Sequence, residues 1–230
     1  MGLKLIVALD FANQRDALNL VEKLNPDQCA IKVGSEMFTL FGADFVRNLV
    51  DKGFKIFLDL KFHDIPNTVA HACKACAELG VWMINVHASG GLKMMQAAKK
   101  AIEPYGEKRP LLIAVTLLTS MGANDLPAIG CNASLDEQVK RLANLAHEAE
   151  LDGVVCSAFE VPMIKKAFGP TFLTITPGIR LPGDQANDQT RIMTPAQALE
   201  LGSDFLVVGR SITSAPEPTT VVQDLLSTIN

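Results

Sequence analysis

The feature that most constrains the fold is a series of short apolar runs, rich in valine and isoleucine, that recurs along the chain. Each run is too short for a typical helix, and most of its successive positions are apolar, which favours a strand buried on both faces. Such strands are typical of parallel sheets covered by helices. The runs occupy residues 3–10, 29–35, 55–61, 82–88, 111–117, 153–158, 172–178 and 204–210.

The segments between the runs have the spacing and end signals of helices. Residues 13–24 and 134–150 repeat apolar side chains at helical intervals, and Ser134 with Glu137 predicts a capping box. Residues 194–202 begin with threonine and proline and end with glycine, as helices commonly do. Strand–helix units repeated in this way predict right-handed crossovers and a parallel sheet.

We therefore expect residues 1–230 to form one α/β domain, a single (β/α)8 TIM barrel. The alternative is an open, doubly wound sheet. That fold commonly carries a GxGxxG motif after its first strand, whereas this chain has ALDFANQRDA at 8–17. The closed barrel is the better prediction, and it places an active site at the carboxyl ends of the strands.

The composition argues against several classes of function. The 230 residues carry a formal net charge of −4, so no basic surplus supports nucleic-acid binding. No apolar stretch approaches the roughly 20 residues of a membrane helix, and the apolar start is too short for a signal peptide. The five cysteines are scattered and odd in number, which indicates reduced thiols in the cytoplasm. The CKAC segment at 73–76 falls within a helical segment, and we interpret its cysteines as core residues.

Charged side chains gather where the third predicted strand ends. Asp59 and Lys61 are two residues apart, so they share a strand face that we expect to point into the barrel mouth. Lys32 takes the same kind of position one strand earlier, and Asp10 one strand before that. Neighbouring parallel strands lie about 4.8 Å apart, so these groups can form one network. The alternative is a set of structural salt bridges, and Asp64 could equally serve as a helix cap.

The ends of the seventh and eighth strands point to a phosphate site. Barrels frequently bind phosphate in the loops after these two strands. Gly178 and Gly209 let backbone N–H groups approach an anion, and Arg180 and Arg210 present planar donors suited to phosphate oxygens. Residues 179–193 form a long polar segment that we expect to act as a lid.

The carboxylates raise the question of a metal ion. Asp59 and Asp64 could together hold Mg²⁺, which usually takes one or two carboxylates plus substrate oxygens. Lys32 and Lys61 would crowd such a site with positive charge, so we expect chemistry without a metal. His87, at the end of the fourth run, is interpreted as a packing or hydrogen-bonding residue.

The segment DLKFHDIPNT at 59–68 resembles the DxKxxDxxxT signature of the orotidine 5′-monophosphate decarboxylase family, in its bacterial form. Further segments match in the family's order, so the resemblance covers nearly the whole chain. These segments are ALDFA at 8–12, KVG at 32–34, NVHASGG at 85–91, PGIR at 177–180 and VVGRSIT at 207–213.

The resemblance implies a reaction and its catalytic residues. Family members decarboxylate orotidine 5′-monophosphate to uridine 5′-monophosphate and CO₂ in pyrimidine biosynthesis, without a metal or organic cofactor. Lys32, Asp59, Lys61 and Asp64 match the family's catalytic network. Lys61 would protonate C6 of the pyrimidine, and Asp59 would face the departing carboxylate. Asp64 and Thr68 would reach the neighbouring subunit's site, which implies a homodimer.

The resemblance also assigns the substrate contacts. Asp10 and Lys32 would bind the ribose hydroxyls. Thr119 would hydrogen-bond the pyrimidine, with Ser120 as the alternative. The phosphate contacts would come from the ends of the last two strands and from the lid, namely Arg180, Gln189, Gly209 and Arg210.

Two other functions stand as alternatives. Related barrels resembling hexulose-phosphate synthases and keto-gulonate-phosphate decarboxylases share the DxKxxD spacing but use a Mg²⁺-bound enediolate. In them a glutamate usually stands where this chain has Lys32. The other alternative is a phosphate-binding barrel without catalytic activity, against which the intact Lys–Asp–Lys–Asp set argues.

Overall fold

The computed structural model describes residues 3–181 and 191–229, and in these residues eight parallel strands close into one barrel. Each strand pairs with its neighbours in chain order, and β1 pairs with β8 to close the sheet. The predicted TIM barrel is therefore confirmed. The strands are β1 Leu5–Leu9, β2 Cys29–Gly34, β3 Ile56–Phe62, β4 Met83–His87, β5 Leu111–Val115, β6 Gly153–Val155, β7 Leu173–Thr176 and β8 Phe205–Val208.

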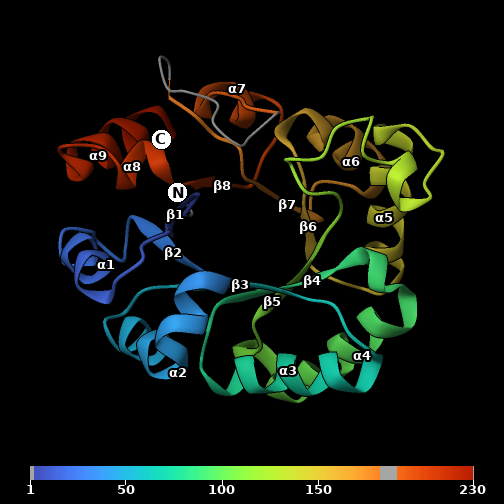
Figure 1. The fold of residues 1–230 in the computed structure, drawn as a ribbon, viewed down its shortest axis with the longest axis horizontal. Coiled ribbons are helices and arrows are strands. Elements are labelled where there is room, and N and C mark those ends of the chain that lie inside the picture. The colour runs from blue at the N-terminus through green and yellow to red at the C-terminus, as the bar shows by residue number, and fades with distance from the viewer. Residues whose placement is uncertain (1–2, 182–190, 230) are drawn as a thin grey trace.

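The helices form a ring outside the barrel (Figure 1). Within the described residues they are α1 Gln14–Val21, α2 Ser35–Asp51, α3 Pro66–Glu78, α4 Leu92–Ile102, α5 Leu135–Glu148, α6 Val161–Phe168, α7 Pro195–Glu200, α8 Arg210–Thr213 and α9 Pro218–Ile229. Short 3₁₀ turns lie in several connections, including Pro127–Ile129 between β5 and α5.

The strands are largely apolar because both of their faces are buried, and the charged exceptions Lys32, Asp59 and Lys61 lie in β2 and β3. In β1, Ile6 and Ala8 point into the barrel interior, whereas Leu5, Val7 and Leu9 pack against the helices. Side chains that alternate in this way build an inner and an outer apolar layer from one continuous run. The interior layer consists of Ile6, Ala8, Ala30, Phe57, Met83, Ile113, Val115, Val155, Ile175 and Val207.

The predicted helix caps are present. The Ser134 hydroxyl accepts a hydrogen bond from the Glu137 backbone N–H, and the Glu137 carboxylate accepts one from Ser134 in return. Thr194 forms the same reciprocal arrangement with Gln197 at the start of α7. Both cysteines of the CKAC segment lie in α3 and are buried, as predicted for core residues.

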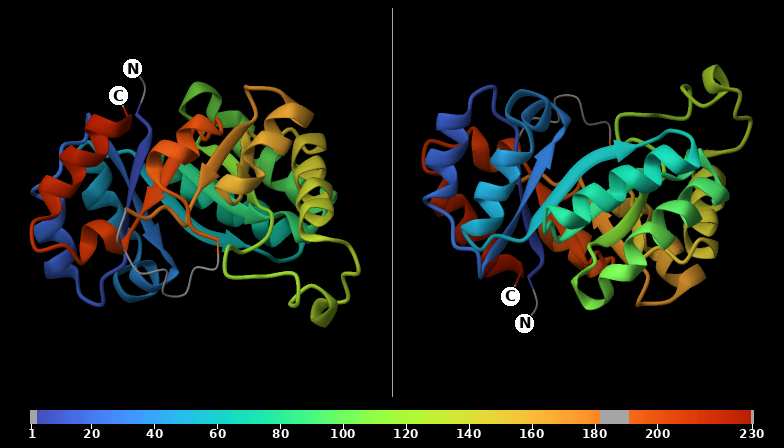
Figure 2. Two further views of the ribbon diagram at one scale, coloured as in Figure 1. Left: turned by 90° about the horizontal axis from the view of Figure 1, so that it is seen from above. Right: turned by 90° about the horizontal axis from the view of Figure 1, so that it is seen from below.

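The two ends of the barrel differ. The start of β1 and the end of α9 lie at one end, and the long connection after β5 extends from the opposite end (Figure 2). That opposite end is where the strands finish and the charged side chains gather. Within residues 3–181 and 191–229, no helix combines the length and the apolar character needed to cross a membrane.

Gly153 allows β6 to approach β7 closely. A Cβ added at this position would lie 2.1 Å from the Leu173 carbonyl oxygen and 2.7 Å from the Leu173 Cβ, so the backbone of one strand must move. We expect Gly153→Ala to lower the free energy of unfolding by about 1–3 kcal/mol and the midpoint of thermal unfolding by roughly 2–10 °C. Circular dichroism during heating measures this midpoint.

Gly122→Ala is the matched control. Among the described residues, a Cβ at Gly122 comes within 4 Å of the Asp125 carboxylate alone, at 3.8 Å, which is ordinary van der Waals contact. An equal shift of the thermal midpoint in both variants would contradict the steric account of Gly153.

Candidate active site

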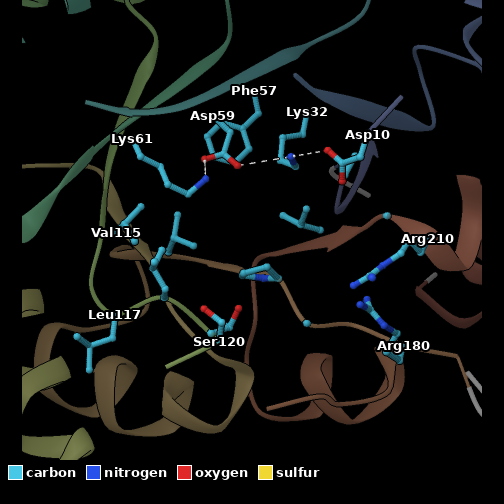
Figure 3. Close-up of a pocket in the computed structure, with 18 residues that line it drawn as sticks. Asp10, Lys32, Phe57, Asp59, Lys61, Val115, Leu117, Ser120, Arg180 and Arg210 are labelled. Carbon is cyan, nitrogen blue, oxygen red and sulfur yellow. Dashed lines mark hydrogen bonds and ion pairs between the residues drawn. The ribbon is translucent and has the colours of Figure 1, made fainter. Parts of the chain in front are cut away.

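A cavity of about 500 Å³ opens at the carboxyl ends of the strands (Figure 3). Its floor is the top of the interior apolar layer and includes Ala8, Phe57, Val115, Val155 and Val207. Its polar lining contains most of the residues selected from the sequence, namely Asp10, Lys32, Asp59, Lys61, Thr119, Ser120, Arg180, Gly209 and Arg210. The cavity thus combines an apolar floor with charged walls, which suits a ligand that has both an apolar part and charged groups.

One wall of the cavity is a continuous chain of ion pairs. Lys32 Nζ lies 3.3 Å from Asp10 Oδ1 and 3.5 Å from Asp59 Oδ2. Lys61 Nζ lies 2.7 Å from Asp59 Oδ1. Figure 3 shows these four side chains in a row, with Asp10 directly after β1, Lys32 in β2, and Asp59 and Lys61 in β3. The alternation of charge predicted from the sequence is therefore present in space.

The position of each charge follows from strand alternation. Ala30 and Phe57 point into the barrel interior, so Lys32 and Asp59, two residues further on, point inward at the mouth. Gly34 keeps the space for the Lys32 ammonium group, because a Cβ there would stand 3.2 Å from Lys32 Nζ. Steric exclusion of a side chain near Lys32 Nζ thus explains why glycine suits position 34 of the KVG segment.

Asp59 is buried and ionised. Its side chain is only 11% exposed. Burial acts to raise the pKa of the carboxyl, but the charges of Lys32 and Lys61, together with hydrogen bonds from Lys61 and Asn85, outweigh burial and hold the pKa below its usual value. The site therefore holds a carboxylate at neutral pH.

Asn85 is a site residue that the sequence analysis did not select. Its amide nitrogen donates to Asp59 Oδ1 at 2.6 Å, and its amide oxygen accepts from the Lys61 backbone N–H at 2.8 Å. A single amide within the apolar strand MINVH is the signal that could have indicated it.

Two arginines occupy the opposite end of the cavity from Lys61 (Figure 3). Arg180 follows β7 and is buried, and its Nη1 donates to the Ile179 carbonyl oxygen at 2.9 Å. Arg210 begins α8 directly after Gly209, and its side chain points towards Arg180 in Figure 3. Gly178 has a positive φ of 78°, a conformation that favours glycine. Guanidinium groups that converge in this way form a site for an anion.

The two ends of the predicted lid are held close to the cavity. Ile179 pairs with Met193, and the Arg180 backbone N–H donates to the Met193 carbonyl oxygen at 3.0 Å. Arg191, which the sequence analysis also missed, pairs with Glu160 and donates to the Leu118 carbonyl oxygen. Gln189 lies outside the described residues, so its phosphate contact stays a prediction.

The connection after β5 brings both pyrimidine-binding candidates to the cavity. Thr119 is buried and Ser120 is exposed, and both line the cavity. The choice between them as the pyrimidine contact stays open.

Comparisons with known proteins identify the family of the chain. Residues 3–225 match the family described as Orotidine 5'-phosphate decarboxylase / HUMPS. The chain belongs to this family. Within it, the chain stands with the bacterial decarboxylases, as the sequence motifs predicted.

Relatives and solved structures resemble the chain over almost its full length. It is 63% identical to the Orotidine 5'-phosphate decarboxylase of Legionella pneumophila (strain Lens), over 97% of each chain. It is 58% identical to that of Vibrio cholerae serotype O1 (strain ATCC 39541 / Classical Ogawa 395 / O395), over 98% of each. The crystal structure of Orotidine 5'-phosphate decarboxylase from Lactobacillus acidophilus shares 40% identity, with a TM-score of 0.88 over 99% of each chain.

Two residues of the family signature lie away from the cavity of this single chain. Asp64 and Thr68 are exposed and do not line the cavity, and Ile65 between them is 67% exposed. The helix-cap interpretation of Asp64 is wrong, because the N-cap of α3 is Ile65, and Asp64 Oδ1 accepts from the Ile65 backbone N–H at 2.6 Å. Pro66 at the first helical position has no backbone N–H, so one fewer hydrogen-bond donor needs a capping side chain.

His87 packs beside a second histidine. Its ring centroid lies 5.5 Å from that of His63, and His63 is exposed. Burial lowers the pKa of His87, the charges of His63 and Lys61 lower it further, and Asp59 acts in the opposite direction. These contacts fit the packing role that the sequence suggested.

Asp59 should make the free energy of unfolding depend on acid pH. Its folded pKa lies below that of an unfolded aspartate, about 3.9, so its stabilising contribution is fully present above that pKa and is lost as pH falls through the folded value. We expect the stability of wild type relative to Asp59→Asn to decrease between about pH 5 and pH 2. Urea denaturation at several pH values measures the difference.

Asp51→Asn, at the exposed end of α2, is the control for the same titration. If the difference between wild type and Asp59→Asn did not change with pH, or if Asp51→Asn changed as much, the assigned pKa shift would be contradicted.

Proposed function

We propose that this chain decarboxylates orotidine 5′-monophosphate to uridine 5′-monophosphate and CO₂ in de novo pyrimidine biosynthesis. The observation that carries the proposal is the pairing of Lys61 Nζ with Asp59 Oδ1 at 2.7 Å in a cavity whose other end holds Arg180 and Arg210. Membership of the decarboxylase family and relatives of that name support it.

The reaction requires a cation beside one carbon atom. Loss of CO₂ from C6 of the orotate ring leaves an electron pair in the ring plane, where the π system cannot delocalise it. An ammonium group fixed beside C6 stabilises this charge as it develops and then donates a proton to it. Lys61 is the proposed donor, since its ammonium group lines the cavity and is held by Asp59.

Asp59 has two proposed roles. It supplies the opposite charge beside both Lys32 and Lys61, so the two ammonium groups can lie close together. It would also face the carboxylate of the substrate, and the repulsion between the two carboxylates would be relieved as CO₂ departs.

The proposed function implies one orientation of the substrate in the cavity. The phosphate would lie at Arg180, Gly209 and Arg210, at the end distant from Lys61, with Gln189 as a further contact. Asp10 and Lys32 would bind the ribose hydroxyls, and Thr119 or Ser120 the pyrimidine. Binding energy gained at the phosphate can then contribute to the rate at C6.

We propose that the reaction uses no metal ion or organic cofactor. Asp59 Oδ1 and Oδ2 are each within ion-pair distance of a lysine ammonium group. A divalent cation at Asp59 would have to displace these groups and would meet two positive charges at close range.

We further propose that the protein acts in the cytoplasm as a homodimer in which Asp64 and Thr68 complete the partner's site. The exposure of both residues and of Ile65 supports a contact at this surface. The five cysteines are free thiols, and four of them are buried, which agrees with a reducing compartment.

The first test is turnover of orotidine 5′-monophosphate in excess EDTA, followed by ultraviolet absorbance. Wild type should consume the substrate, and Lys61→Ala should lower kcat/KM by at least about 10³-fold. Lys140→Ala, an exposed lysine on α5, is the control and should match wild type. Calorimetric binding of uridine 5′-monophosphate to Lys61→Ala checks that the site is folded.

No turnover in EDTA, combined with activity on a keto-sugar phosphate after Mg²⁺ is restored, would overturn the proposal. The chain would then belong with the sugar-phosphate enzymes, and Asp59 would become a candidate metal ligand.

Mixing two inactive variants tests the shared site. If Asp64 serves the partner's site, a hybrid of Lys61→Ala and Asp64→Ala chains contains one site with both residues intact. An equal mixture should regain about a quarter of wild-type activity, because half of randomly formed dimers are hybrids with one intact site. Steady-state turnover after subunit exchange measures the recovery.

A mixture of Lys61→Ala and Asp59→Asn is the control, because both changes affect the same chain's network and every site stays defective. If the Asp64→Ala mixture recovered no more activity than this control, Asp64 would act within its own chain or not at all.

A further inference from the structure

Asn85 is a polar residue in an otherwise apolar part of the barrel. It lies in β4 two residues after Met83, which belongs to the interior apolar layer, and Ile113 is its register partner on β5. Its side chain is fully buried, and it does not line the cavity. A valine or isoleucine would suit this position better on packing grounds alone, because a buried amide must find partners for its polar atoms.

The Asn85 side-chain amide forms hydrogen bonds to two different residues of the site. Its nitrogen donates to Asp59 Oδ1 at 2.6 Å, the same oxygen that accepts from Lys61 Nζ at 2.7 Å. Its oxygen accepts from the backbone N–H of Lys61 at 2.8 Å. Because one end of the amide donates and the other accepts, these two partners determine its orientation.

The backbone of Lys61 needs such a partner. Lys61 has a φ of 52°, in the left-handed region that non-glycine residues rarely adopt. The pairing of β3 with β4 also shifts register between Leu58 and Phe62, so regular strand pairing is interrupted at this residue. Strained backbone of this kind persists where the surrounding structure holds it, and it concentrates at functional sites.

We propose that Asn85 is a positioning residue that ties the Lys61 backbone to the Asp59 carboxylate and so directs the Lys61 ammonium group into the cavity. It acts through Asp59 and Lys61 rather than by touching the substrate. The role rests on the proposed function, since it concerns the ammonium group that would protonate C6.

Loss of the Asn85 amide would alter the acidity of Asp59. The groups that face this carboxylate are Lys32 on β2, Lys61 on β3 and Asn85 on β4, with Asp10 bound to Lys32 and His87 close by on β4. Asn85 supplies one of the hydrogen bonds that favour the ionised form of Asp59. Its removal should therefore make the carboxylate easier to protonate.

The test compares Asn85→Leu, which removes both hydrogen bonds, with Asn85→Asp, which keeps an acceptor for Lys61 and places a second carboxyl beside Asp59. Each variant should lower kcat by about 10- to 100-fold, with the affinity for uridine 5′-monophosphate within about threefold of wild type. In Asn85→Leu, the acid limb of the pH profile of kcat should shift to higher pH by about one unit. In Asn85→Asp, the shift to higher pH should be larger.

Thr174→Val is the matched control. Thr174 is a fully buried polar residue of β7, bonded to Asp204 and outside the cavity. This variant should lower the thermal midpoint without moving the pH profile. If the Asn85 variants likewise lowered only the thermal midpoint, Asn85 would be a structural residue and the proposal would be overturned.

A measurement on wild type separates this proposal from the proposed function and does not depend on how the variants fold. Hydrogen exchange should show the Lys61 amide protected, because this partly buried donor is bonded to the Asn85 amide oxygen. Rapid exchange would overturn the positioning role even if the enzyme is active. Absence of turnover in wild type would instead overturn the proposed function. The exchange rate of the Lys61 amide could still be interpreted in that case.

Discussion

The structure of the site depends on one buried carboxylate that is shared by two ammonium groups. Asp59 could not stay ionised in the barrel mouth alone, because desolvation of an unpaired charge is costly. Lys32 and Lys61 lie on either side of it, and Asn85 donates a further hydrogen bond. The same contacts bring two cations close together in the cavity wall, and the carboxylate between them offsets their mutual repulsion.

The barrel supplies the rigid frame that this network needs. Strand alternation puts apolar side chains in the interior layer, and the next inward position on β2 and β3 carries Lys32 and Asp59. The segment after β7 and the start of α8 after β8 place Arg180 and Arg210 at the other end of the cavity. Under the proposed function, these two separate charged regions would orient a phosphorylated substrate along the cavity, and binding at one end would assist chemistry at the other.

Much of this arrangement could be predicted from local pattern. Continuous apolar runs indicated strands buried on both faces, and the caps at Ser134 and Thr194 formed as expected. The period of two along β3 predicted that Asp59 and Lys61 would meet, and their ion pair is present although the Lys61 backbone departs from regular strand geometry. Asp64 was harder to interpret, because its spacing fits a helix cap, whereas Ile65 takes the cap position in the structure. Residues near a helix start admit several backbone conformations, and sequence spacing does not distinguish them.

The sequence by itself determined the strand order, the alternation of charge at the barrel mouth and the arginines at the far end, because each depends on period and residue type. Only the tertiary structure decided how Lys61 is held: its left-handed backbone, the register shift beside it and the Asn85 amide from a strand 24 residues away. Hydrogen bonds between strands depend on register and on individual backbone torsions. The register shift and the left-handed torsion at Lys61 depart from the regular strand pattern, so the residue period along β3 did not predict them.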